Sequence, residues 1–131
     1  MQFGIQVTKP LGVSEKEAKN SDQIFKLYLN GNFVVEIVEE FTTLTNVLFA
    51  GGMRRLAIDL AELKYIDSTG IGVLINVAKL LRSKSGDMVF LNVNSKIMEV
   101  FSLVKLQEFI PCFKSEKQML EHLSSIHSWY F

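Results

Sequence analysis

The segment Ile66-Asp67-Ser68-Thr69-Gly70-Ile71-Gly72 carries the residue types in this chain that are best suited to chemistry. It lies between a short apolar run and an apolar stretch with helical spacing, so its polar residues are expected at the start of a helix. Such residues commonly cap helix N-termini, and a helix N-terminus offers free backbone N–H groups and a positive dipole end. A phosphate on Ser68 would therefore suit the fold while adding a charge of about −1.5 to −2 to the surface.

Two glycines of the segment, Gly70 and Gly72, fall in the first turns of the expected helix. Each costs about 1 kcal/mol there relative to alanine, so close packing on a sheet or close approach of another molecule should offset the cost. Asp67 or Ser68 could also serve only as a helix cap, with the glycines serving only packing. The motif by itself favours this structural interpretation.

The elements that position this segment alternate between strands and helices. Apolar patterns predict strands over 3–7, 24–29, 56–60, 88–93 and 109–113, and helices over 34–50, 68–83, 95–106 and from 115 onward. This order implies crossover connections and a mostly parallel sheet, with the first two strands paired as a hairpin-like edge. We expect one α/β domain over 1–131, with about five strands and about four helices.

Several finer features follow from local patterns. The polar segment 9–23 is expected to be a long surface loop, and Gly31 is expected to mark a turn. In the second strand, Lys26 and Tyr28 should face away from the buried apolar side chains. Ser115 and Gln118 form a capping box for the last helix, which is expected to continue in line with Ile126 and Tyr130.

The composition argues against several classes of function. Fourteen Lys and Arg residues balance fourteen Asp and Glu residues along the chain, which argues against binding nucleic acid. No apolar run is long enough to span a bilayer, and the first ten residues lack the features of a signal peptide. The chain is therefore expected to be soluble and cytoplasmic. Its one cysteine, Cys112, lies in an apolar run and is expected to be a small buried hydrophobe.

Other catalytic patterns are missing from the sequence. His122 and His127 are five residues apart, which does not suit a metal pair on one helix face, so both are expected to face solvent. Gly70 and Gly72 lack the third glycine of a dinucleotide fingerprint, and Ser68 lacks the Gly-x-Ser-x-Gly surroundings of a hydrolase nucleophile. The sequence contains no phosphate-binding loop. We expect a protein that is not an enzyme and that carries no cofactor or metal.

The run Leu56-Ala57-Ile58-Asp59-Leu60, a short spacer and the segment from Tyr65 to Leu74 closely resemble the STAS domains of bacterial anti-sigma factor antagonists. The resemblance continues into 89–93, 100–103 and 113–120, and covers roughly residues 24–123. Asp-Ser-Thr-Gly alone is a weak pattern, but its place after a strand containing an aspartate, with the later elements in order, makes it specific. Outside the resemblance, 9–23 looks longer than usual, and 124–131 is an aromatic tail ending in Trp129-Tyr130-Phe131.

The resemblance implies helices packed on a mixed sheet, and a phosphorylation switch at Ser68. An anti-sigma factor with serine kinase activity would phosphorylate Ser68 with its own ATP and magnesium, and a serine phosphatase would reset it. The unphosphorylated form would bind that anti-sigma factor and release a sigma factor. Asp67 would matter for the interface and for kinase recognition, and Thr69, Gly70 and Gly72 would complete the partner-binding surface.

One departure from the family lies before the first helix. Family members often carry an acidic or hydroxyl residue just after the glycine there, whereas this chain has Gly31-Asn32-Phe33-Val34, with Glu36 as the first acid. Two alternatives remain open: a STAS scaffold subunit of a stress-signalling or lipid-transport complex, and an enzyme or nucleotide-binding protein that uses the same helix end for phosphate. Titration with ATP and GTP would test the second alternative.

Overall fold

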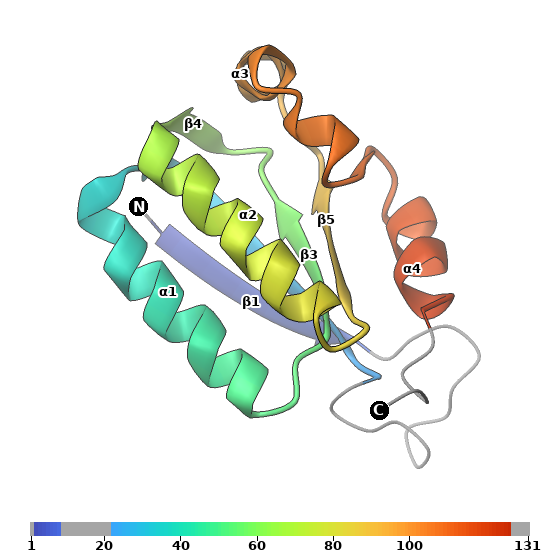
Figure 1. The fold of residues 1–131 in the computed structure, drawn as a ribbon. Helices are drawn as coiled ribbons and strands as arrows, with labels where there is room; N and C mark the ends of the chain where they lie inside the picture. Colours follow the sequence, from blue (N-terminus) through green and yellow to red (C-terminus); the bar gives the residue numbers. More distant parts are fainter. Residues whose placement is uncertain (1, 9–21, 127–131) are drawn as a thin grey trace.

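The computed structural model describes residues 2–8 and 22–126, in which six strands form a sheet flanked by helices (Figure 1). The strands are β1 (Gln2–Thr8), β2 (Ile24–Phe33), β3 (Arg55–Asp59), β4 (Leu63–Ile66), β5 (Asp87–Leu91) and β6 (Cys112–Phe113). The helices are α1 (Val35–Ala50), α2 (Ser68–Arg82), α3 (Ser95–Leu103) and α4 (Glu116–Ser124), with a 3-10 turn, η1 (Leu106–Glu108), after α3.

The sheet has the order β1-β2-β3-β5-β6, and β4 pairs with the far end of β2. β1 runs antiparallel to β2, and every other pair is parallel. The predicted fold class, with its hairpin-like edge and crossover helices, is confirmed. Every residue of β3 is buried, which fits the continuous apolar run of a strand covered on both faces.

Two apolar layers cover the two faces of the sheet. On one face, alternate residues such as Leu27, Ile58 and Phe90 join the main core, in which α1 and α2 take part. On the other face, Ile24, Ala57 and Val89 pack in a second cluster with Met119 and Leu123 of α4. The register of β2, β3 and β5 separates the two sets by the two-residue period of a strand.

The predicted turn at Gly31 is wrong, because β2 continues through it to Phe33. Gly31 has a φ of 101°, which glycine adopts without a steric penalty. At this point the register of β2 with β4 shifts, as in a β-bulge. The first half of β2 pairs with β3 and the last three residues pair with β4, so the glycine lets one strand change neighbours.

The segment read from the sequence as a spacer before Tyr65 includes part of a strand, β4. Only its end residues, Leu63 and Ile66, are buried, while Lys64 and Tyr65 are exposed. Four residues with two exposed in the middle give too weak a pattern to predict a strand.

Lys26 lies on the opposite face of β2 from Leu27 and Leu29, as predicted, but that face is covered as well. Lys26 is buried, and its Nζ lies 3.1 Å from Oε1 of Glu116 at the start of α4. The sequence pattern was read with one buried face, whereas α4 covers the second face. Burial acts to lower the pKa of Lys26, but its contacts with Tyr28 and Glu116 outweigh burial and leave that pKa raised.

The later elements are shorter than predicted. The helix expected over 95–106 ends at Leu103, since Lys105 adopts a left-handed backbone with a φ of 57°. The strand expected over 109–113 is reduced to β6, and α4 ends at Ser124. The Ser115 hydroxyl caps α4 by accepting the backbone N–H of Gln118 at 3.3 Å. Tyr130, the rest of the aromatic tail and most of segment 9–23 lie outside the described residues.

Cys112 is half-buried rather than fully buried. Burial raises the pKa of its thiol, and its Sγ lies 3.7 Å from the carbonyl oxygen of Ile110. A raised thiol pKa lowers the thiolate fraction at neutral pH, which fits a packing role for this side chain.

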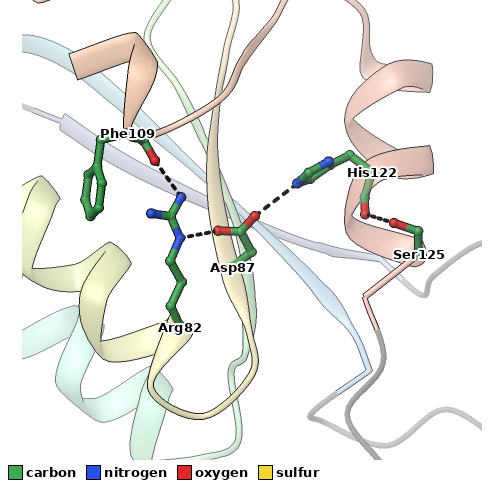
Figure 2. Close-up of polar contacts among 5 residues, drawn as sticks. All are labelled: Arg82, Asp87, Phe109, His122 and Ser125. Carbon is green, nitrogen blue, oxygen red and sulfur yellow. Dashed lines mark hydrogen bonds and ion pairs between the residues drawn. The ribbon is translucent and has the colours of Figure 1, made fainter. Parts of the chain in front are cut away.

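His122 does not simply face solvent, contrary to expectation (Figure 2). Its Nε2 lies 3.0 Å from Oδ2 of Asp87, at the start of β5. The other carboxylate oxygen of Asp87 accepts a hydrogen bond from Nε of Arg82 at 2.7 Å. Arg82 also donates to the carbonyl oxygen of Phe109 at 2.8 Å and lies over the Phe109 ring. These contacts join α2, β5, α4 and the segment after η1. His127 lies outside the described residues.

Candidate functional site

The candidate site lies where two parallel strands lead into two helices. The ends of β2 and β4 are paired, with Phe33 opposite Ile66. α1 begins at Val35 and α2 begins at Ser68, each two residues beyond that pair. Because parallel strands end on the same side of a sheet, the N-termini of α1 and α2 lie at the same end of the molecule (Figure 1).

Asp67 connects the two helix N-termini. Its Oδ1 accepts the backbone N–H of Gly70 at 2.8 Å and caps α2. Its Oδ2 accepts the backbone N–H of Val35, the first residue of α1, at 3.1 Å. Val34, at the N-cap position of α1, provides no side-chain cap. One carboxylate therefore serves as the cap of one helix and supplies the missing acceptor for the other.

Ser68 and Thr69 form the exposed surface of the site. They are the first two residues of α2, and both are exposed. Their backbone N–H groups have no hydrogen-bond partner within the described parts of the chain, as expected in the first turn of a helix. The capping role considered for Asp67 or Ser68 is filled by Asp67, so the hydroxyl of Ser68 is not needed as a cap.

The two glycines differ in their surroundings. A Cβ atom on Gly70 would lie 2.7 Å from the carbonyl oxygen of Phe33 and 2.9 Å from a side-chain atom of Ile66. Close packing thus accounts for Gly70. A Cβ atom on Gly72 would meet nothing within 4 Å, so packing within the described structure does not account for that glycine.

Two exposed apolar residues lie on the other elements that form this end of the sheet, and neither was singled out from the sequence. Val35 is 55% exposed at the start of α1, and Tyr65 is 53% exposed on β4. Both belong to the elements that Asp67 and the β2–β4 pairing hold at this end of the sheet. The absence of a capping residue at Val34 was the one sequence signal that α1 needs an acceptor from elsewhere.

No group of three His, Cys, Asp or Glu side chains among the described residues could hold a metal ion. Within residues 2–8 and 22–126, no helix combines the length and apolar character needed to cross a membrane.

Replacing Asp67 tests its double capping role. Asp67→Ala should lower the free energy of unfolding by about 2 kcal/mol, because each lost cap costs about 1 kcal/mol. Asp67→Asn, which keeps one acceptor oxygen, should lose about half as much. Urea denaturation measures both variants, and Ser115→Ala, which removes the single cap of α4, is the control. An Asp67→Ala loss no larger than that of Ser115→Ala would contradict the double role.

Comparison with known proteins identifies the family. The sequence model of the STAS domain family matches residues 15–119. This match spans most of the chain, so the protein belongs to the STAS domain family, and the resemblance read from the sequence is confirmed.

Individual relatives agree with this assignment. An anti-sigma-B factor antagonist from Listeria monocytogenes is 33% identical over 64 residues, which are 49% of this chain and 56% of the Listeria protein. The match thus spans little more than half of that relative. An anti-sigma-B factor antagonist from Staphylococcus aureus is 23% identical over 94 residues, which are 72% of this chain and 87% of the relative.

Solved structures of SpoIIAA share the fold. The unphosphorylated form of this anti-sigma factor antagonist superposes with a TM-score of 0.61 and 18% identity, covering 94% of this chain and all of SpoIIAA. The phosphorylated form, from Bacillus, gives a TM-score of 0.60 and 19% identity over 76% of this chain and 89% of that one.

Proposed function

We propose that this chain is an anti-sigma factor antagonist that is switched by phosphorylation of Ser68. Unphosphorylated, it binds an anti-sigma factor with serine kinase activity in the cytoplasm, so that a sigma factor is released. Phosphorylated, it no longer binds, and a serine phosphatase restores it. The observation that carries the proposal is the exposed hydroxyl of Ser68 on a helix N-terminus that Asp67 already caps.

The site is suited to accept a phosphoryl group. The kinase transfers the γ-phosphoryl of its bound ATP to Oγ of Ser68, ADP leaves, and the hydroxyl proton passes to a base on the kinase. The product phosphate lies at the positive end of the α2 dipole, beside the free N–H groups of Ser68 and Thr69. Since no hydrogen bond of the folded chain is lost in this reaction, the fold tolerates the modification.

The same phosphate opposes binding. The elements at this end of the sheet also expose the apolar side chains of Val35 and Tyr65, and Gly72 leaves room for a partner to approach α2 closely. A partner that covers this surface removes it from water. A new charge of about −1.5 to −2 would then have to be desolvated within the interface, which costs binding free energy.

The relatives support this role. The proteins from Listeria monocytogenes and Staphylococcus aureus are named anti-sigma-B factor antagonists. SpoIIAA, which shares the fold, has been solved in unphosphorylated and phosphorylated forms. The region of this chain that matches the STAS domain model, residues 15–119, includes Ser68.

Phosphopeptide mapping tests the proposal directly. The chain is purified from its native cell under several growth conditions, and we expect phosphate on Ser68 in at least one of them. Incubation with the co-purified anti-sigma factor and ATP should add phosphate to the wild type and not to Ser68→Ala. A chain that is never modified, and that remains in one large stable complex, would instead indicate a scaffold subunit.

A further inference from the structure

Strand β1 forms an outer edge of the sheet. It pairs with β2 along its whole length, from Gln2 opposite Asn30 to Thr8 opposite Ile24, without a register shift. No other strand of the described residues pairs with it. In such an edge strand, every second residue directs its backbone N–H and C=O away from the sheet, where they can accept another strand.

The usual protections of an edge strand are missing from β1. Gln2–Thr8 contains no charged residue and no proline, and its continuous register contains no bulge. Natural proteins commonly block edges with charges, prolines, bulges or very short strands. The opposite edge of this sheet follows that rule, because β6 has two residues. Among the described residues, β1 is thus the edge that is open to pairing.

The side chains of β1 are self-complementary. Phe3, Ile5 and Val7 point to the α1 side of the sheet, where the Phe3 ring lies 6.0 Å from that of Phe41. Ile5 and Val7 remain 48% and 45% exposed. Two β1 strands that pair antiparallel about Ile5 overlap fully, with Phe3 opposite Val7 of the second copy and Gly4 opposite Gln6. The apolar row then continues across the pair on one face.

We propose that β1 is a homodimer surface, in which two copies of this chain join their sheets through antiparallel β1 strands centred on Ile5. The formal net charge of the chain is zero, so two copies do not repel each other through net charge. Burying Ile5 and Val7 in the pair removes apolar surface from water and favours association. The proposal rests on β1 alone and is independent of the role of Ser68.

Introducing a charged residue at Ile5, the centre of the pair, provides the first test. In sedimentation velocity, the wild type should reach twice the 14.9 kDa chain mass as its concentration rises. Ile5→Lys and Ile5→Glu should each remain monomers, because they place like charges directly opposite each other. An equimolar mixture of the two should restore the dimer. Val104→Lys, at a site of similar exposure on a different element, should dimerise like the wild type.

Two outcomes would overturn the proposal. A wild type that stays monomeric at concentrations approaching millimolar would contradict the homodimer and would favour pairing of β1 with a strand of another protein. A dimer that survives in Ile5→Lys would use another surface. Circular dichroism should show that the variants fold, which is expected because Ile5 is about half exposed.

A cross-linking experiment tests the register independently. In a Cys112→Ser background, Ile5→Cys should form an intermolecular disulfide under mild oxidation, since opposite residues of an antiparallel pair have Cα atoms about 4.5–5.5 Å apart, within disulfide range. Gln6→Cys is the matched control. Residue 6 lies opposite Gly4 of the second copy, so the two residues at position 6 are diagonal neighbours, about 7–8 Å apart. Equal cross-linking of the two variants, or none of either, would contradict the Ile5-centred pair.

Discussion

Ser68→Asp should weaken binding of this chain to the proposed anti-sigma factor partner by at least about tenfold, or about 1.4 kcal/mol, while Ser68→Ala should bind like the unmodified wild type. The aspartate places a charge on the exposed first residue of α2, in the middle of the proposed interface. The alanine removes only a hydroxyl, which the fold does not use as a cap. Isothermal titration with the purified anti-sigma factor compares the three proteins.

The stability of the same variants separates a switch from a structural effect. Because an acidic residue in the first turn of a helix interacts favourably with the helix dipole, Ser68→Asp should unfold at or slightly above the wild-type temperature. A large drop in its thermal midpoint would mean that Ser68 supports the fold. Equal affinities of Ser68→Asp and Ser68→Ala would rule out control by charge.

Gly70→Ala should be the most damaging small substitution in α2, lowering the free energy of unfolding by about 2–3 kcal/mol. The added Cβ would lie 2.7 Å from the carbonyl oxygen of Phe33 and 2.8 Å from its ring. Neither neighbour can move freely, because the Phe33 carbonyl accepts the N–H of Asp67 and its ring is fully buried. Overpacking of this kind typically costs about 1–3 kcal/mol. Urea denaturation measures the loss.

Gly72→Ala is the matched control, two residues further along the same helix. It should raise the free energy of unfolding by about 0.5–1 kcal/mol, because the Cβ atom meets nothing and alanine favours the helix. If the partner packs closely on Gly72, the same variant should also bind more weakly. Stabilities that fall alike in Gly70→Ala and Gly72→Ala would mean that local packing does not distinguish the two positions.

The local sequence predicted most of the architecture. The apolar periods of α1, α2 and β3 are strong because each element presents a long or fully buried apolar surface to the core. The helix start at Ser68 and the exposed placement of Ser68 and Thr69 follow from the same patterns. Packing against the sheet reinforces these preferences, so local and tertiary forces agree.

Features that depend on distant residues could not be read from the sequence. The bond from Val35 to Asp67 spans 32 positions, and it exists only because β2 and β4 are neighbours. β4 itself was not predicted, because only two of its four residues are buried. Gly31 has the composition of a turn, but whether its positive φ ends a strand or shifts its register depends on the next strand.

Lys26 and His122 show a second limit of pattern reading. His122 was expected to face solvent, and Lys26 was expected on the face of its strand opposite Leu27. Both make contacts that α4 brings about: Lys26 contacts Glu116, and His122 contacts Asp87 (Figure 2). The alternation of a strand tells which residues share a face but not how many faces are covered. The position of α4 over the second face had to come from the structure.

Because Asp67 accepts hydrogen bonds from two helices, the Asp-Ser-Thr-Gly motif cannot be moved into another protein as a four-residue segment. Placed at the start of an isolated helix, these four residues would retain the contact from Gly70 to Asp67 and lose the one from Val35. Gly70 would also lack the backbone of Phe33, against which it packs. A designer who wants a phosphorylatable serine in this setting would have to transfer both parallel strands and the first turns of both helices.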